Sequence, residues 1–205
     1  MTEFLHRYVA WQCLEKYTSI PNSRVCIITG PRIDLAEDLI ARFKNLFSGN
    51  MISHISDRTA STVAFLNEVK VEAFPSHHVD TMRGRDNVKF IMSDESDFYP
   101  TFQQKEVRAV MEGYIGKPNS DPHIVLVSTP KAPGGLMQQI EFESDSLYHK
   151  LFFDYHHGLE GPYPIYSQQQ IDKARLSPEF PREYELQYLG ILGNVFSQTS
   201  IESCQ

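Results

Sequence analysis

The sequence predicts an α/β protein in which a mainly parallel central sheet is covered by helices on both faces. Five short runs are apolar almost throughout and rich in β-branched or aromatic residues, as is typical of strands buried on both faces. Amphipathic segments lie between these runs, and this alternation favours parallel strands joined by helical crossovers. We therefore expect a three-layer α/β domain with strands at residues 24–29, 71–74, 88–93, 124–128 and 148–155.

In the first half of the chain, one helix is expected before the first strand and one after it. Apolar residues recur at three- and four-residue spacing over 3–17, which indicates an amphipathic helix. The strand 24–29 ends at a Gly-Pro pair, and a second helical pattern runs from 34 to 47 and stops at a Gly-Asn pair. A weak strand and a short helix around 62–66 are expected before the next buried strand.

In the second half, the apolar spacing predicts a long helix at 104–115, between the strands 88–93 and 124–128. A shorter helix is expected at 137–142, entered through a Pro-Gly-Gly turn. The aromatic-rich run 148–155 is interpreted as the last strand. Two short helices are expected in the tail, around 168–176 and 182–189, followed by the segment 190–196.

Composition limits the class of protein. The chain has 205 residues and 23.6 kDa, which fits a single domain over residues 1–205. Apolar residues make up 41% and charged residues 22%, so global disorder and a membrane partner are both excluded. Three widely spaced cysteines form no CxxC pair, which favours a reducing cytoplasm. A net charge of -7 argues against a dedicated nucleic-acid coat but allows a local basic channel.

Acidic residues follow the buried strand 88–93, in the stretch KFIMSDESDF. Ligands of doubly wound sheets bind beyond the carboxyl ends of the strands, and nucleotide-hydrolysing sheets use an Asp-Glu pair at such an end. Asp94 and Glu95 have this position, and Ser128-Thr129 ends a second strand at a separation that allows one helix between them. The alternative interpretation is that the two acids cap the turn or helix that follows. Asp97 is expected to be solvated or to cap that helix.

Four segments resemble a known family in their order and spacing. FIMSDES is preceded by TMRGRDN and followed by VLVSTPKAPGGLM and FPREYELQYLG. This set resembles the ATPase domain of the large terminase subunit, the DNA-packaging motor of tailed viruses and a P-loop NTPase related to superfamily 2 helicases. The resemblance covers residues 24–196.

The resemblance implies a set of functional residues. Asp94 would coordinate Mg²⁺, Glu95 would be the catalytic base, and Ser128 and Thr129 would couple hydrolysis to movement. ATP and Mg²⁺ are the implied cofactors. Double-stranded DNA, a homo-oligomeric ring, and a portal protein or small terminase subunit are the implied partners, in the cytoplasm of a host cell if the protein is viral.

Two arginines and a threonine complete the candidate site. Arg83 and Arg85 lie in a polar loop that leads into the strand 88–93, and they either contact phosphate, within the subunit or from a neighbour in a ring, or are solvated surface residues. The family requires a phosphate loop, GxxxxGK followed by Ser or Thr, before its first helix. The sequence contains no such motif and begins Met1-Thr2, so Thr2 stands where the last residue of that motif would be.

Because this motif is missing, two alternative functions are expected. The simplest account is a truncated terminase ATPase domain, without its phosphate loop and nuclease domain, that is inactive alone because nothing replaces the loop's lysine. The alternative is a non-hydrolysing assembly or DNA-interaction module that keeps the fold.

Other polar and aromatic features are given structural interpretations. The Gly134-Gly135 pair is expected to form a flexible turn, and the aromatic run 148–155 to serve as core and interface. Adjacent histidines on a strand point to opposite faces, and neither pair has zinc-ligand spacing, so a metal role is not favoured. The two histidine pairs, each with a nearby aspartate, are His77-His78 with Asp80 and His156-His157 with Asp154.

Overall fold

The computed structural model of this chain describes residues 2–55 and 60–189. Contacts between residues divide the chain into two compact units, Met1–Ser128 and Thr129–Gln205. Each unit is described by itself. The first holds the sheet and the candidate site, and the second is built from short helices.

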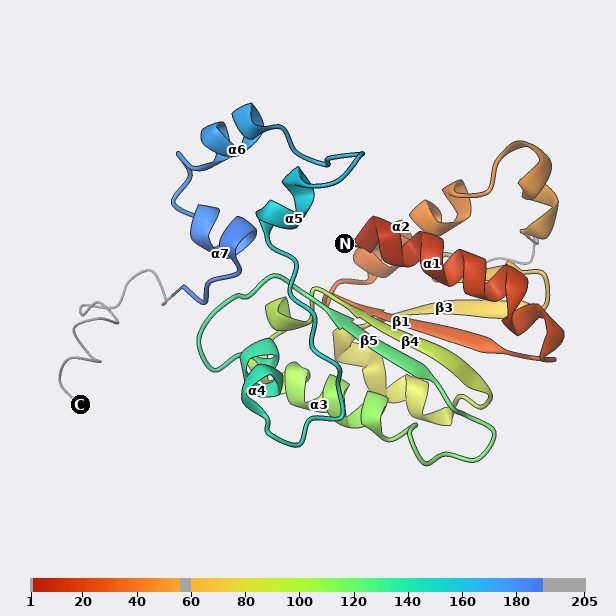
Figure 1. Cartoon of the computed structure of the whole chain (residues 1–205). Coiled ribbons are helices and arrows are strands. Elements are labelled where there is room, and N and C mark those ends of the chain that lie inside the picture. The colour runs from red at the N-terminus through yellow and green to blue at the C-terminus, as the bar shows by residue number, and fades with distance from the viewer. Residues whose placement is uncertain (1, 56–59, 190–205) are drawn as a thin grey trace. The chain divides into compact units, whose positions relative to one another are not determined.

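A five-stranded sheet forms the centre of the first unit (Figure 1). Its spatial order is β2-β3-β1-β4-β5, and β3, β1, β4 and β5 run parallel while the edge strand β2 is antiparallel to β3. The first four predicted strands are therefore confirmed, in one mainly parallel sheet. The strand bounds are β1 Arg24–Thr29, β2 Val63–Leu66, β3 Val69–Pro75, β4 Val88–Asp94 and β5 His123–Val127.

Helices cover both faces of this sheet, which confirms the three-layer arrangement (Figure 1). Alternate side chains of β1 divide between the layers: Val25 and Ile27 pack under α1 and α2, whereas Cys26 and Ile28 pack under α3 and η3. All four are buried, which explains why the strand is apolar throughout. The helix bounds in this unit are α1 Thr2–Glu15, η1 Tyr17–Ser19, α2 Ile33–Asn45, η2 Gly49–His54, η3 Ser76–Gly84, η4 Ser96–Phe98 and α3 Thr101–Glu112.

The second unit contains the helices α4 Leu136–Phe142, α5 Tyr155–Leu159, α6 Gln168–Ala174 and α7 Phe180–Glu185. Its small core is formed by Tyr155, Ile171 and Phe180. The start of α6 is fixed by a capping box, in which Ser167 and Gln170 satisfy each other's backbone amides. None of the helices in the described ranges is long and apolar enough to cross a bilayer.

Two predicted elements differ from the structure. The expected strand 148–155 is absent: the chain has no regular structure over 150–154, and α5 begins at Tyr155 because the Asp154 carboxylate accepts a hydrogen bond from the His156 amide and caps the helix. The expected short helix at 62–66 is instead strand β2, which pairs with β3 through a hairpin. The segment 190–196 lies outside the described residues.

Candidate functional site

The carboxyl ends of β4 and β5 bring the two polar strand ends together. Asp94 is the last residue of β4 and is in register with Val127 on β5, so Ser128 lies beside the acidic pair. Ser93 pairs with Leu126 in the same ladder, so the two polar strand ends are neighbours. Asp94, Glu95 and Ser128 therefore lie together at the carboxyl ends of the parallel strands, where ligands of such sheets bind.

Asp94 is tied to the first turn of α1. The Thr2 hydroxyl donates a hydrogen bond of 2.7 Å from Oγ1 to Asp94 Oδ1, and the Asp94 side chain is buried. A hydroxyl and a carboxylate placed side by side are hard oxygen donors of the kind that Mg²⁺ prefers, and Mg²⁺ commonly takes only one or two protein ligands besides water and phosphate oxygens. These two residues therefore fit the metal that the sequence implies.

Glu95 occupies an unusual backbone conformation. Its φ of 53° and ψ of 44° lie in the left-handed region, which a side chain with a Cβ adopts at a cost. This turn ends β4 and starts η4, so the side chain of Glu95 leaves the line of the strand. Its Oε2 atom lies 3.4 Å from Ser128 Oγ, a hydroxyl donor on the neighbouring strand end. Backbone strain of this kind is concentrated at functional sites.

Of the two expectations for Asp97, solvation is wrong, because the residue is 1% exposed. The N-cap positions of η4 and α3 are Glu95 and Pro100, so Asp97 is not the N-cap residue of either helix. It lies within η4 (Ser96–Phe98), where its amide donates to Ser128 Oγ at 3.2 Å and its carbonyl accepts a hydrogen bond from Gln104 Nε2 at 2.8 Å. Ser128 thus contacts both Glu95 and the backbone of Asp97 and links the two strand ends.

A network of buried hydroxyl groups is hydrogen-bonded to the backbone of the acidic pair. Ser96 Oγ donates to Ser93 Oγ at 2.9 Å, and Ser93 Oγ lies 3.1 Å from the Tyr99 hydroxyl. The Tyr99 hydroxyl donates to the carbonyl of Asp94 at 2.7 Å and lies 3.0 Å from the carbonyl of Ile28 on β1. Burial raises the pKa of Tyr99 well above its ordinary value, so its hydroxyl keeps its proton and remains a donor. No pattern in the sequence indicates this network.

The two arginines do not lie at the acidic pair. Both precede β4 whereas Asp94 ends it, and a strand of this length spans about 20 Å. Arg85 Nε lies 3.4 Å from Glu72 Oε1, and Arg83 Nε lies 2.8 Å from Asp80 Oδ1. The expectation that these arginines reach phosphate within the same subunit has no support in this geometry, because a residue before a parallel strand lies at the opposite edge of the sheet.

The structure also places the other residues that the sequence singled out. Gly134 has a φ of 79° and forms a turn before α4, as expected. Of the aromatic run, Tyr155 is buried in the core of the second unit, whereas Phe152 and Phe153 are exposed. Within the described residues no group of three or more His, Cys, Asp or Glu side chains is placed to hold a metal ion, the two histidine pairs included. Thr129 is the first residue of the second unit.

His6 is a residue of the site region that the sequence analysis missed. It lies one turn after Thr2 on α1, is fully buried, and has no hydrogen-bond partner for either ring nitrogen. Burial lowers its pKa from the ordinary value, while the negative charge of Asp94 acts in the opposite direction. The sequence offered no signal for its burial, because the apolar spacing predicts a buried stripe through Phe4 and Trp11. These two residues are 64% and 55% exposed, and α1 instead buries the face that holds His6.

Comparison with known proteins shows what this fold resembles. The large terminase ATPase domain of Thermus phage P74-26 matches with a TM-score of 0.55 and 14% identity, over 90% of this chain and 84% of that chain. The large terminase of bacteriophage HK97 matches with a TM-score of 0.58 and 14% identity, over 92% of this chain and 45% of that chain.

A third similar structure is the large terminase of a thermophilic bacteriophage in complex with ADP, with a TM-score of 0.60 and 12% identity over 93% of this chain and 48% of that chain. The chain thus spans about half the length of the two larger terminase structures it matches. No protein-family model and no curated protein matches the sequence. At these identities the likeness establishes the fold: this chain has the fold of large terminase ATPase domains.

Proposed function

We propose that this chain is the ATPase domain, or a fragment of the ATPase domain, of a viral large terminase subunit that couples ATP hydrolysis to the packaging of double-stranded DNA. The observation that carries the proposal is the 2.7 Å hydrogen bond between Thr2 Oγ1 and Asp94 Oδ1. It joins the start of the first helix to the carboxylate that ends β4, which is where P-loop NTPases hold Mg²⁺ with a hydroxyl and an aspartate. The shared fold supports the same conclusion.

Each residue has a distinct task in this proposal. Thr2 and Asp94 would hold the metal through their oxygens, and Mg²⁺ when bound neutralises charge on the phosphates of ATP. Glu95, turned out of the strand by its left-handed backbone, accepts a proton from the attacking water. Ser128 contacts both Glu95 and the Asp97 amide, so it is placed to respond when the charge near Glu95 changes, and Thr129 carries that response along the chain.

Partners follow from the same proposal. Large terminases of this kind would act on double-stranded DNA as a homo-oligomeric ring, with a portal protein or small terminase subunit, in the cytoplasm of a host cell. Arg83 is half exposed at the surface of the first unit. In a ring it would be offered to the nucleotide of a neighbouring copy, where an arginine stabilises charge that develops on the transferred phosphate. Arg85 is assigned instead to the ion pair with Glu72.

The experiment that tests the proposal uses a protein in which a GxxxxGK loop precedes Thr2. Asp94→Asn removes the metal's anionic ligand and is expected to weaken Mg-nucleotide binding together with turnover. Glu95→Gln keeps the shape and removes only the base, so nucleotide still binds while kcat falls by roughly 10²–10⁴-fold. Asp121→Asn, the same chemical change at an exposed acid before β5, is the matched control and should alter neither. Equal effects of all three substitutions would defeat the proposal.

A second candidate function is that of a non-hydrolysing assembly or DNA-interaction module with a degenerate P-loop NTPase fold. Both candidates predict negligible ATP turnover by the 205-residue polypeptide alone. They differ once the loop is added: a gain of Mg²⁺-dependent turnover that Glu95→Gln abolishes supports the motor, and continued inactivity supports the module.

A further inference from the structure

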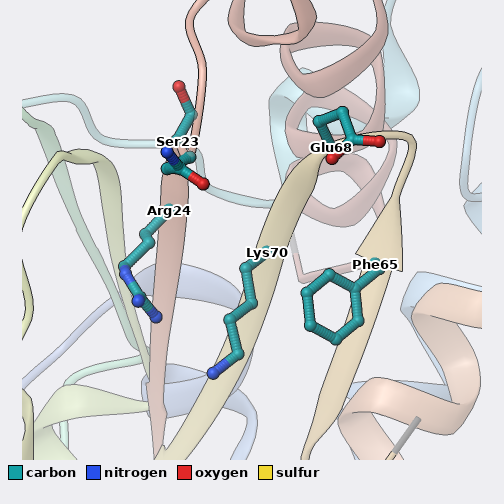
Figure 2. Close-up of a pocket in the computed structure, with 6 residues that line it drawn as sticks. Ser23, Arg24, Phe65, Glu68 and Lys70 are labelled. Atoms are coloured by element: carbon teal, nitrogen blue, oxygen red, sulfur yellow. The ribbon is translucent and has the colours of Figure 1, made fainter. Parts of the chain in front are cut away.

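A small pocket lies at the amino ends of the parallel strands β1 and β3, whereas the acidic pair lies at the carboxyl end of β4. It encloses about 160 Å³ and is unrelated to the residues of the proposed ATPase site. We call it the amino-edge pocket, and Figure 2 shows its lining. The lining comes from the loop before β1, the hairpin between β2 and β3, and the strands β1, β2 and β3 themselves. It consists of Asn22, Ser23, Arg24, Phe65, Glu68 and Lys70.

The pocket places two like charges beside each other. Arg24 and Lys70 are directly in register on the parallel strands β1 and β3, and neighbouring like charges on a sheet repel. Glu72, two residues further along β3, offsets this repulsion: Arg24 Nη1 and Lys70 Nζ each lie 2.8 Å from one of its carboxylate oxygens. Arg85 adds a third cation to the same carboxylate at 3.4 Å.

One carboxylate does not balance three cations. Glu72 is buried, with a side chain 4% exposed, and a single bidentate arginine would have been enough to satisfy it. The Arg24 and Lys70 side chains stay about 30% and 28% exposed, so their charge is available to solvent at the pocket. The remaining acid of the lining, Glu68, lies in the hairpin turn, away from both cationic head groups (Figure 2).

The geometry of the cations suits a phosphate group. Figure 2 shows the Arg24 and Lys70 side chains extending in the same direction from neighbouring strands, so their head groups share one region of space. A guanidinium carries five N–H donors and an ammonium three, and each of these groups donates one hydrogen bond to Glu72. Arginine binds phosphate oxygens in pairs and lysine binds them as a point charge. Phe65 forms an apolar wall, with the Lys70 ammonium 6.0 Å from its ring centroid.

We propose that the amino-edge pocket is an anion site that binds a phosphate group through Arg24 and Lys70. This site is independent of the proposed ATPase activity, because it uses none of the residues at the carboxyl edge. The phosphate is either that of a small solute or a phosphodiester of a nucleic-acid backbone, and the two sources share the same recognition chemistry. A basic pocket of this kind is not a consequence of composition, since the chain has a net charge of -7.

The test measures inorganic phosphate binding to the 205-residue chain by calorimetry at low ionic strength. Lys70→Gln is expected to weaken saturable binding by about tenfold or more, since hydrogen bonds to charged groups are strong. Lys105→Gln, an exposed lysine of α3, is the matched control and should leave the affinity unchanged. Glu72→Gln removes the competing carboxylate at nearly constant shape and should tighten phosphate binding, which a purely structural ion-pair cluster would not do.

A second arm separates the two sources of phosphate. If the pocket contacts a nucleic-acid backbone, Lys70→Gln weakens binding of a short DNA duplex relative to Lys105→Gln, and inorganic phosphate competes with the duplex. If the pocket takes a small solute, duplex affinity is the same in both variants while phosphate affinity differs. Absence of saturable phosphate binding, or equal losses in the two lysine variants, overturns the proposal. Trp11 fluorescence confirms that each variant is folded before it is compared.

Discussion

The hydroxyl of Tyr99 offers a direct test of how the acidic loop is supported. The change is Tyr99→Phe, which removes one oxygen from a ring that is 1% exposed and leaves the ring's packing in place. That oxygen donates to the Asp94 carbonyl at 2.7 Å, lies 3.0 Å from the Ile28 carbonyl, and lies 3.1 Å from Ser93 Oγ. A hydroxyl has one proton and two lone pairs, so about two of these contacts are full hydrogen bonds at any moment.

The expected cost follows from those two bonds. At about 1 kcal/mol each, with the partner groups left buried, Tyr99→Phe should lower the free energy of unfolding by about 2 kcal/mol. That corresponds to roughly a 30-fold change in the ratio of folded to unfolded protein. The midpoint of thermal unfolding should fall by about 6–10 °C for a unit of this size.

Urea unfolding followed by tryptophan fluorescence measures this effect. Trp11 is the chain's single tryptophan and lies on α1, in the same unit as Tyr99, so its signal reports the relevant transition. Tyr163→Phe deletes the same atom from a side chain that is 91% exposed and should change nothing. A Tyr99→Phe protein within about 0.5 kcal/mol of the wild type would refute the argument that this hydroxyl supports the turn at Asp94.

Two further predictions concern the same edge of the sheet. Burial lowers the pKa of His6, and the positive charge of Arg42 acts in the same direction, whereas Asp94 and Glu3 raise it. Below its ordinary pKa, His6 is therefore protonated more fully in the unfolded chain than in the folded chain. Stability should therefore fall as pH drops below about 6.5, and His6→Leu should flatten that dependence in urea titrations between pH 5 and 7; an unchanged slope would contradict it. At Glu95 the positive φ strains any residue with a Cβ, so Glu95→Gly should be more stable than Glu95→Ala by about 1 kcal/mol, although both lose the carboxylate. Equal stabilities, or a more stable alanine variant, would show that the turn is not strained.

Much of the first unit could be predicted from hydrophobic pattern alone. The core residues of β1 and β4 follow one another without polar alternation, and a sheet with helices on both faces buries such runs. β3 alternates at Lys70 and Glu72, and β5 is only partly buried, so these two strands carry a weaker signal. The acidic pair was predictable for a related reason: Asp94 and Glu95 directly follow a buried strand, where a loop is forced and ligands bind.

The failures have physical causes of a different kind. Local chemistry decided the segment at 148–155, where Asp154 caps a helix that the aromatic, strand-like composition does not favour. Long-range contacts decided the rest. The bond from Thr2 to Asp94 joins residues 92 positions apart, and the Tyr99 hydroxyl reaches the Ile28 carbonyl across 71 positions. Arg85, in the loop before β4, pairs with Glu72 on β3, and no spacing along the chain reveals that pairing.

Two adjacent carboxylates at the end of a buried strand repel each other, and the structure resolves this repulsion with the chain's own atoms. Asp94 remains in the strand and receives a hydrogen bond from Thr2, whereas the left-handed turn at Glu95 carries the second carboxylate out of the strand toward Ser128. Each acid therefore has a hydrogen-bond donor of its own. In the proposed function, this separation by the backbone would allow one acid to hold a ligand and the other to take a proton.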